Sequence, residues 1–273
     1  MKRFFDSHSH LQEIRFDGDR DAVLFRASCA SVRDIVVCGE DLKSSEAAVE
    51  LAQLTDTVRI LPTVGFHPHE AEKATPSALR ELQGLAGEPD VVALGEIGLD
   101  FYRELVPRAK QRRVLDAQLE IAALVGLPVC VHSRGAESHL VEPLGEFAAA
   151  SPLRESGRPL GVMHAFGGTL EQAQLYVDLG FLISFACSAG YPGNTQARRV
   201  VAELPLEMLL IETDSPALPP QDQRGTRNEP ANVIAAAKVI ATVRGESIET
   251  IAAATALNGE LLLLDRVVGG ASS

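Results

Sequence analysis

Short apolar runs alternate along this chain with longer segments of helical spacing, and the alternation occurs eight times. The apolar runs lie at residues 3–5, 34–39, 59–65, 91–95, 127–131, 160–163, 181–185 and 208–211. Short, continuously apolar strands separated by helices are typical of a parallel sheet that is covered by those helices. Eight such units in a chain of this length predict an α/β fold of the (β/α)8 TIM-barrel type, although a doubly wound open sheet remains an alternative.

Helix caps help to place the helical segments between these runs. We expect helices at residues 44–54, 75–85, 107–125, 137–149, 169–179, 195–204, 230–243 and 247–264. Thr75 followed by Pro76 is typical of a helix start, and Gly126 is typical of a helix end. No linker rich in Gly, Ser or Pro interrupts the series, so we expect residues 1–273 to form a single domain.

Composition and charge narrow the functional classes. The chain of 273 residues has 37 acidic and 25 basic side chains, a net charge of -12, and 46% hydrophobic residues. This hydrophobic content excludes a disordered chain, and the acidity argues against a protein that coats long nucleic acid by neutralising phosphates. There is no apolar stretch of about 18 residues and no apolar run behind Lys2 and Arg3, so we expect a cytoplasmic protein with no membrane partner. Four scattered cysteines predict reduced, mostly buried thiols.

Most of the histidines occur where predicted strands end. Of the seven histidines, six stand at or within a few residues of such an end: His8, His10, His67, His69, His132 and His164. Glu96 and Asp214 follow the fourth and eighth runs in the same way. In a (β/α)8 barrel these ends converge on one face, where the active site lies. A structural role is the commoner explanation for any one such residue, but it would have to hold for all of them at once.

Imidazoles and carboxylates in this number indicate a metal centre. The candidate ligands are His8, His10, His132, His164, Glu96 and Asp214. His8 and His10 are two positions apart in a strand, so both rings can reach one ion. Four imidazoles and two carboxylates suit zinc, manganese, iron or nickel better than Mg²⁺, which prefers oxygen ligands. Six ligands are too many for one catalytic ion that keeps an open position, so we expect two ions that share Glu96. Such a pair of ions activates a water molecule, which Asp214 could orient or deprotonate.

Eight motifs match a known family in order along the chain. They are FDSHSHL (5–11), GFHPHEA (65–71), GEIGLDFY (95–102), QLEIA (118–122), LPVCVHSR (127–134), MHAFGGT (163–169), IETDSP (211–216) and RNEP (227–230). With these motifs the chain resembles the TatD family of metal-dependent deoxyribonucleases, in the amidohydrolase superfamily, from residue 5 to about residue 264. One departure is Gly135, which stands where the family often carries an acidic residue.

The resemblance implies a (β/α)8 fold and a metal-dependent exonuclease that hydrolyses phosphodiester bonds at DNA ends, which we expect to be single-stranded and digested 3′ to 5′. It implies two divalent ions (Mg²⁺, Mn²⁺, Zn²⁺ or Ni²⁺), one held by His8, His10, Glu96 and Asp214 and the other by Glu96, His132 and His164. Glu96 and Asp214 are then the expected catalytic carboxylates. The expected substrate contacts are His67 at a phosphate and, more weakly, His69, Arg134, Tyr102 and Arg227. Glu212 is either a buried hydrogen-bonded carboxylate or a catalytic group.

Two other functions remain open at this point. The first is an amidase, lactonase or deacylase for a small molecule on the same barrel. Many such barrels bridge their metals with a carbamylated lysine at the fourth or fifth strand, whereas here the fourth strand delivers Glu96 and no lysine lies near any strand end. The second is a non-enzymatic metal-binding scaffold, although nothing in the sequence indicates a dedicated or obligate protein partner.

Overall fold

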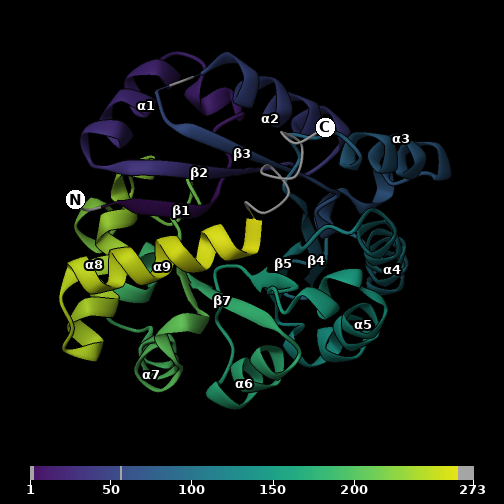
Figure 1. Cartoon of the computed structure of the whole chain (residues 1–273). Coiled ribbons are helices and arrows are strands. Elements are labelled where there is room, and N and C mark those ends of the chain that lie inside the picture. The colour runs from purple at the N-terminus through teal and green to yellow at the C-terminus, as the bar shows by residue number, and fades with distance from the viewer. Residues whose placement is uncertain (1–2, 56, 264–273) are drawn as a thin grey trace.

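A computed structural model describes residues 3–55 and 57–263, and its central element is a sheet of parallel strands in sequence order (Figure 1). The strands are β1 (Phe4–Ser9), β2 (Val32–Cys38), β3 (Arg59–Val64), β4 (Ala93–Asp100), β5 (Val129–Arg134), β6 (Gly161–Met163), β7 (Phe181–Phe185) and β8 (Leu209–Ile211). The helices are α1 (Arg20–Cys29), α2 (Leu42–Leu54), α3 (Pro76–Ala86), α4 (Arg108–Val125), α5 (Glu137–Ala150), α6 (Leu170–Asp178), α7 (Thr195–Glu203), α8 (Val233–Arg244) and α9 (Ile248–Leu263).

The last strand returns to the first, so the sheet forms a nearly closed barrel. Beyond β8 the chain pairs with the end of β1 through a parallel bridge between Ser9 and Ser215. The Asp214 amide donates to the His8 carbonyl at 2.9 Å, and the His10 amide donates to the Ser215 carbonyl at 2.7 Å. This closure excludes the open-sheet alternative and brings the two ends of the barrel sequence together.

Two apolar layers hold the barrel. The larger layer lies between the strands and the surrounding helices, where residues such as Ile35, Leu94 and Ile183 are fully buried. A smaller cluster, which includes Phe5, Leu61, Leu182 and Leu210, also contains Ala256, Leu262 and Leu263 of α9. In Figure 1 α9, drawn in yellow, crosses in front of the strands. Helix α9 therefore completes the second layer at one end, and the opposite end stays open to polar side chains.

Single-residue irregularities occur in β1 and β4 near the candidate ligands. Between Asp6 and Ser9 the first strand advances three residues while β2 advances two, from Ile35 to Val37. The same shift occurs in β4 between Leu94 and Ile97, against two residues of β5. Such bulges bend a strand and redirect side chains, and they are common beside active sites. They lie at the positions of His8 and Glu96.

The structure confirms the predicted barrel and most helix positions, and it corrects several bounds. The first, fourth and fifth strands extend beyond their apolar runs to Ser9, Asp100 and Arg134, because polar residues that interrupt the apolar run, such as Glu96 and His132, face the cavity. Helix α1 was not among the expected helices, and only Val23, Leu24 and Ala27 of it are buried. The helix expected from residue 230 begins at Val233, after a short 3-10 turn.

Substitution of Gly98 should test the close contact between β4 and β5. Gly98 has φ +145°, and an added Cβ would lie 2.0 Å from the His132 carbonyl oxygen. We expect Gly98→Ala to lower the free energy of unfolding by at least about 2 kcal/mol, measured by urea titration. The matched control is Gly84→Ala in α3, where nothing lies within 4 Å of the added Cβ. That change should raise stability by up to about 1 kcal/mol, and equal effects of both changes would contradict this account.

Candidate metal centre

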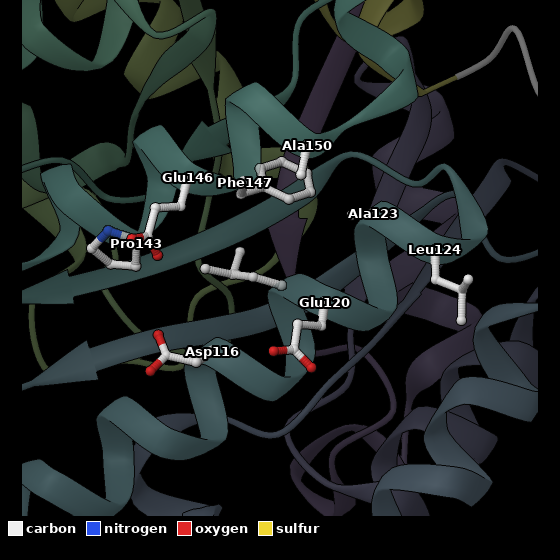
Figure 2. Close-up of a pocket in the computed structure, with 9 residues that line it drawn as sticks. Asp116, Glu120, Ala123, Leu124, Pro143, Glu146, Phe147 and Ala150 are labelled. Carbon is white, nitrogen blue, oxygen red and sulfur yellow. The ribbon is translucent and has the colours of Figure 1, made fainter.

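A cavity of about 760 Å³ opens at the C-terminal ends of the strands. The candidate ligands and phosphate contacts that line it are His10, His67, His69, Glu96, His132, His164 and Asp214. A second hollow, of about 480 Å³, lies on the outside of the barrel between α4 and α5 (Figure 2). Its lining includes Leu119, Phe147 and three carboxylates but no histidine or cysteine. The groups suited to metal chemistry therefore gather in the barrel cavity.

Glu96 lies at the middle of this set and is almost fully buried. Its Oε2 atom is 3.3 Å from His8 Nε2 and 3.5 Å from His10 Nε2. Its Oε1 atom is 2.8 Å from His132 Nδ1 and 3.0 Å from His164 Nε2. The two carboxylate oxygens thus face different imidazoles, with His67 Nε2 also 3.5 Å from Oε1, and this division is the arrangement expected of a bridging ligand.

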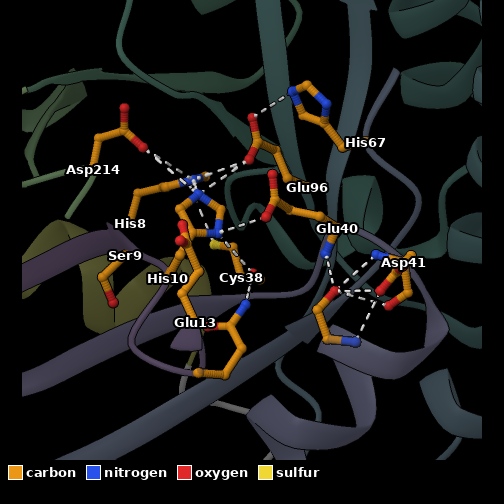
Figure 3. A network of polar contacts seen from close by, with 12 residues as sticks. His8, Ser9, His10, Glu13, Cys38, Glu40, Asp41, His67, Glu96 and Asp214 are labelled. Carbon is orange, nitrogen blue, oxygen red and sulfur yellow. Dashed lines mark hydrogen bonds and ion pairs between the residues drawn. The ribbon is translucent and has the colours of Figure 1, made fainter. Parts of the chain in front are cut away.

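Asp214 approaches the first pair of imidazoles from the segment after β8. Its Oδ1 atom lies 3.6 Å from His10 Nε2 and 3.9 Å from His8 Nε2, and Figure 3 shows its side chain directed toward them. The residue has φ +53°, an uncommon conformation for a residue other than glycine. The Asp214–His8 backbone hydrogen bond that closes the barrel holds it there.

The donor atoms fit divalent ions. His8 Nε2 and His10 Nε2 face each other at 3.2 Å, and so do His132 Nδ1 and His164 Nε2. Two ring nitrogens at this distance repel each other unless a proton or a cation lies between them, and imidazole with carboxylate is a common ligand combination for divalent transition metals. The group of His8, His10 and Glu96 has all its donor atoms within 4.8 Å of one another. On the other side of Glu96 the group that meets the same limit is His67, Glu96 and His132, so candidate donors for an ion lie on each side of Glu96.

Oxygen atoms lie near the outward nitrogen of three of these rings and hydrogen-bond with those of His10 and His164. His10 Nδ1 donates to the Cys38 carbonyl at 3.0 Å, and His164 Nδ1 lies 3.2 Å from Glu212 Oε1. His132 Nε2 lies 3.5 Å from Asp100 Oδ2. Such partners set the ring orientation and tautomer of metal-binding histidines. Glu212 is fully buried and also accepts from the Ala165 amide, as its hydrogen-bonded interpretation predicts.

Asp100 lies within the GEIGLDFY motif (95–102), but the sequence predicts no role for it. Its Oδ1 atom accepts from the amides of Tyr102 and Arg103, and its Oδ2 atom lies 2.9 Å from His69 Nε2. Asp100 thereby ties β4 to the rings of His69 and His132. The signal that could have found it is its place at the end of the fourth strand, four residues after Glu96.

His67 differs from its neighbours in the nitrogen that it presents. Its Nδ1 atom accepts from the His69 amide at 3.1 Å, so a neutral ring carries its hydrogen on Nε2. That Nε2 atom lies 3.5 Å from Glu96 Oε1. Burial, followed by the nearby His132 and His69 rings, holds the pKa of His67 well below its usual value. A neutral ring with its hydrogen on Nε2 is a hydrogen-bond donor at the cavity wall.

The other expected substrate contacts lie farther from the ligands. Arg134 lines the cavity, and its guanidinium lies 4.2 Å from the ring centre of the exposed Tyr102, which is outside the lining. Arg227 also lies outside the lining, because it makes a bidentate ion pair with Asp19 and stacks on the Phe16 ring. The structure thus brings Arg134 and Tyr102 to the cavity edge but holds Arg227 elsewhere.

Acidic side chains outnumber arginines in the lining of the cavity. The pKa of Glu96 stays well below its usual range, because the rings of His164, His67 and His8 outweigh the effect of burial. The lining as a whole carries six carboxylates (Glu13, Glu40, Glu96, Asp100, Glu137 and Asp214) and three guanidinium groups (Arg15, Arg103 and Arg134). Carboxylates therefore outnumber guanidinium groups in this lining by two to one.

The sequence predicted mostly buried, reduced cysteines and no membrane-spanning segment. All four cysteines are free, and Cys38, Cys130 and Cys187 are buried, as predicted, whereas Cys29 is exposed. Among the helices of the described ranges, none combines the length and apolar character needed to cross a membrane.

Comparisons with known proteins agree with this geometry. The family model described as "TatD related DNase" matches residues 5–263. The chain is 34% identical over 258 residues to the "Uncharacterized metal-dependent hydrolase YabD" of Bacillus subtilis, which covers 94% of this chain and 98% of that protein. It is also 34% identical over 265 residues to the "3'-5' ssDNA/RNA exonuclease TatD" of Salmonella typhimurium, with 94% of this chain and 98% of that protein covered.

The crystal structure of YjjV, a TatD homologue from Escherichia coli, superposes with a TM-score of 0.86 at 34% identity. The superposition covers 96% of this chain and 98% of that one. A TatD-family hydrolase from Entamoeba histolytica superposes with a TM-score of 0.82 at 24% identity, which supports the fold.

Metal binding to this centre should depend on pH. Burial would lower the pKa values of His10 and His164, but carboxylates outweigh it: Asp214 and Glu40 raise that of His10 to about 9, and Glu96 and Glu212 raise that of His164 to about 10. Both rings therefore carry a proton at neutral pH in the ion-free protein, and a bound ion must displace it. We expect Mn²⁺ affinity to rise about tenfold or more from about pH 6 to about pH 9.

Calorimetry in buffers of different ionisation enthalpy would measure the released protons directly. The His10→Ala, His164→Ala double variant should release fewer protons than the unsubstituted protein. An affinity that does not change over this pH range would contradict the expectation.

Proposed function

Because this chain belongs to the TatD-related DNase family and is a metal-dependent hydrolase acting on ester bonds, we propose that it is a 3′–5′ exonuclease of single-stranded DNA that uses two divalent ions. The observation that carries the proposal is the position of Glu96, whose Oε2 faces His8 and His10 while its Oε1 faces His132 and His164. The Salmonella relative, a 3'-5' ssDNA/RNA exonuclease by name, supports the polarity and a single-stranded substrate.

The ligand assignment follows from the nitrogens that face Glu96. His8, His10 and Asp214 would hold one ion with Glu96, and His132 and His164 would hold the other with Glu96. Bound there, Mg²⁺, Mn²⁺, Zn²⁺ or Ni²⁺ would lower the pKa of a water molecule and offset charge on the phosphodiester. The protein itself fixes the positions of these ligands, because barrel closure holds Asp214 and hydrogen bonds orient the rings of His10 and His164.

Asp214 is suited to accept the proton of the attacking water. Burial would raise its pKa, but the neighbouring His10, His164 and His8 rings keep it below its usual value, so the carboxylate is ionised at neutral pH. Its side chain is 17% exposed, against 3% for Glu96. Asp214 can therefore reach solvent in the cavity, whereas Glu96 serves as a buried bridge.

His67 is suited to bind a phosphate oxygen. The residue lines the cavity with its Nε2 atom 3.5 Å from Glu96 Oε1, and its Nδ1 is already occupied by the His69 amide. Arg134 and Arg103 offer further positive charge at the cavity edge. Few phosphates are contacted in this arrangement, so a net charge of -12 is compatible with a nucleic-acid substrate that is held at its end.

The proposed bridging role of Glu96 predicts a large loss of nuclease activity when this residue is substituted. With Mn²⁺ present, the protein should shorten a 5′-labelled single-stranded oligonucleotide stepwise, which a sequencing gel would resolve. We expect Glu96→Gln to lower the rate at least about 100-fold, because the neutral amide supplies one oxygen ligand in place of two. Glu120→Gln, in the hollow between α4 and α5, is the matched control and should keep the rate.

The same preparation should be tested on lactones and N-acyl amides. Hydrolysis of these compounds together with an unchanged oligonucleotide, under each of the four metals, would replace the nuclease proposal with the small-molecule hydrolase. No hydrolysis of any ester or amide would reject both.

His67→Ala should separate phosphate binding from metal binding. Loss of one charge-assisted hydrogen bond to phosphate should lower kcat/KM on the oligonucleotide by about 10- to 100-fold. The number of Mn²⁺ ions bound per chain should not change, whereas His132→Ala should reduce it. Metal content can be counted by elemental analysis after gel filtration, and a loss of Mn²⁺ from His67→Ala would identify His67 as a ligand instead.

A further inference from the structure

The outward nitrogen of His8 has a different partner from those of the other rings. His10, His132 and His164 direct that nitrogen at oxygen atoms, namely the Cys38 carbonyl, Asp100 Oδ2 and Glu212 Oε1. His8 directs its Nδ1 at two sulfur atoms, with Cys130 Sγ at 3.2 Å and Cys38 Sγ at 3.4 Å. Figure 3 shows Cys38 beneath the two imidazoles. The thiols thus occupy the position that a carbonyl or carboxylate takes elsewhere in the centre.

These sulfurs come from strands far apart in the barrel. Cys38 ends β2 and Cys130 lies in β5, and both side chains are buried in the inner apolar cluster. His8 itself is fully buried, so water cannot replace a missing partner at Nδ1 without opening the core. A ring that offers its Nε2 lone pair to an ion carries its hydrogen on Nδ1, and a buried N–H needs an acceptor.

From this geometry we infer that Cys130, assisted by Cys38, is a positioning residue that accepts the Nδ1–H of His8 and holds its Nε2 toward Glu96 and Asp214. The inference rests on the proposed metal centre. Cys38 serves both histidines of the pair, because its side chain faces His8 while its carbonyl accepts from His10. At His8 the nearer acceptor is Cys130, at 3.2 Å against 3.4 Å for Cys38, and a substitution of the Cys38 side chain leaves the carbonyl that serves His10 in place.

The size of the effect follows from the weakness of sulfur as an acceptor. Loss of the partner of a metal-binding histidine commonly weakens metal affinity by about 10- to 100-fold, and a thiol belongs at the low end of this range. We therefore expect Cys130→Ala to weaken Mn²⁺ binding about tenfold. Cys130→Ser keeps an acceptor and should stay within about threefold of the original affinity.

The experiment is a titration of the ion-free full-length protein with Mn²⁺, in which electron paramagnetic resonance counts the free ion. Cys187→Ala is the matched control, because Cys187 is also buried but bonds the Asn232 carbonyl away from the cavity. It should lower the melting temperature without changing Mn²⁺ affinity. Cys38→Ala should weaken binding less than Cys130→Ala and serves as a second variant if the latter does not fold.

Three results would overturn the inference. Cys130→Ala could bind Mn²⁺ as tightly as the original chain, or Cys130→Ser could be as impaired as Cys130→Ala, which would indicate packing alone. The third concerns Cd²⁺, which gives an ultraviolet absorption band when thiolates bind it. If Cys187→Ala keeps this band and Cys130→Ala loses it, the thiol of Cys130 is itself a metal ligand. If the original chain binds no Mn²⁺, the proposed metal centre fails instead, so the two failures are distinguishable.

Discussion

The Glu96 carboxylate is buried among imidazoles, and both of its oxygens depend on them. Removing a carboxylate from water is costly unless opposite charges or donors surround it, and here His8 and His10 face one oxygen while His132 and His164 face the other. Four strands supply these groups, so the centre exists only when the barrel is closed. The bulge in β4 and the closure between β8 and β1 are therefore features of the site as much as of the fold.

Each proposed metal-binding imidazole directs one ring nitrogen at Glu96 and has another group near its second ring nitrogen. Asp100, Glu212, the Cys38 carbonyl and the two thiols together reach the outward nitrogen of every proposed metal-binding ring. His67 lacks this pattern because the His69 amide occupies its Nδ1, leaving a donor in the cavity. The tautomers thus divide the histidines into proposed ligands and a proposed phosphate contact, a division that residue type alone does not provide.

The acidity of the chain extends into the cavity. Six carboxylates line it, against three guanidinium groups and the protonated rings of His10 and His164, so these groups supply no excess of positive charge for a phosphodiester without bound cations. In the proposed function, bound ions supply that positive charge, and substrate binding depends on them. This fits a protein that holds one strand end at a time, and it explains why a net charge of -12 does not conflict with a nucleic-acid substrate.

The eightfold alternation predicted the barrel from the sequence, because strand and helix periodicities are local properties. The positions of His8, Glu96, His132 and Asp214 after apolar runs also predicted that these residues would meet, since parallel strands all end on one face of a barrel. Only the tertiary structure decided which nitrogen of each histidine ring faces Glu96 and which groups contact the other nitrogen. Cys130 and His8 are 122 residues apart in the sequence, and Arg227 and Asp19, which form an ion pair, are 208 residues apart. Contacts of this kind depend on strand register, bulges and loop paths, which arise when distant segments pack and leave no periodic signal in the chain.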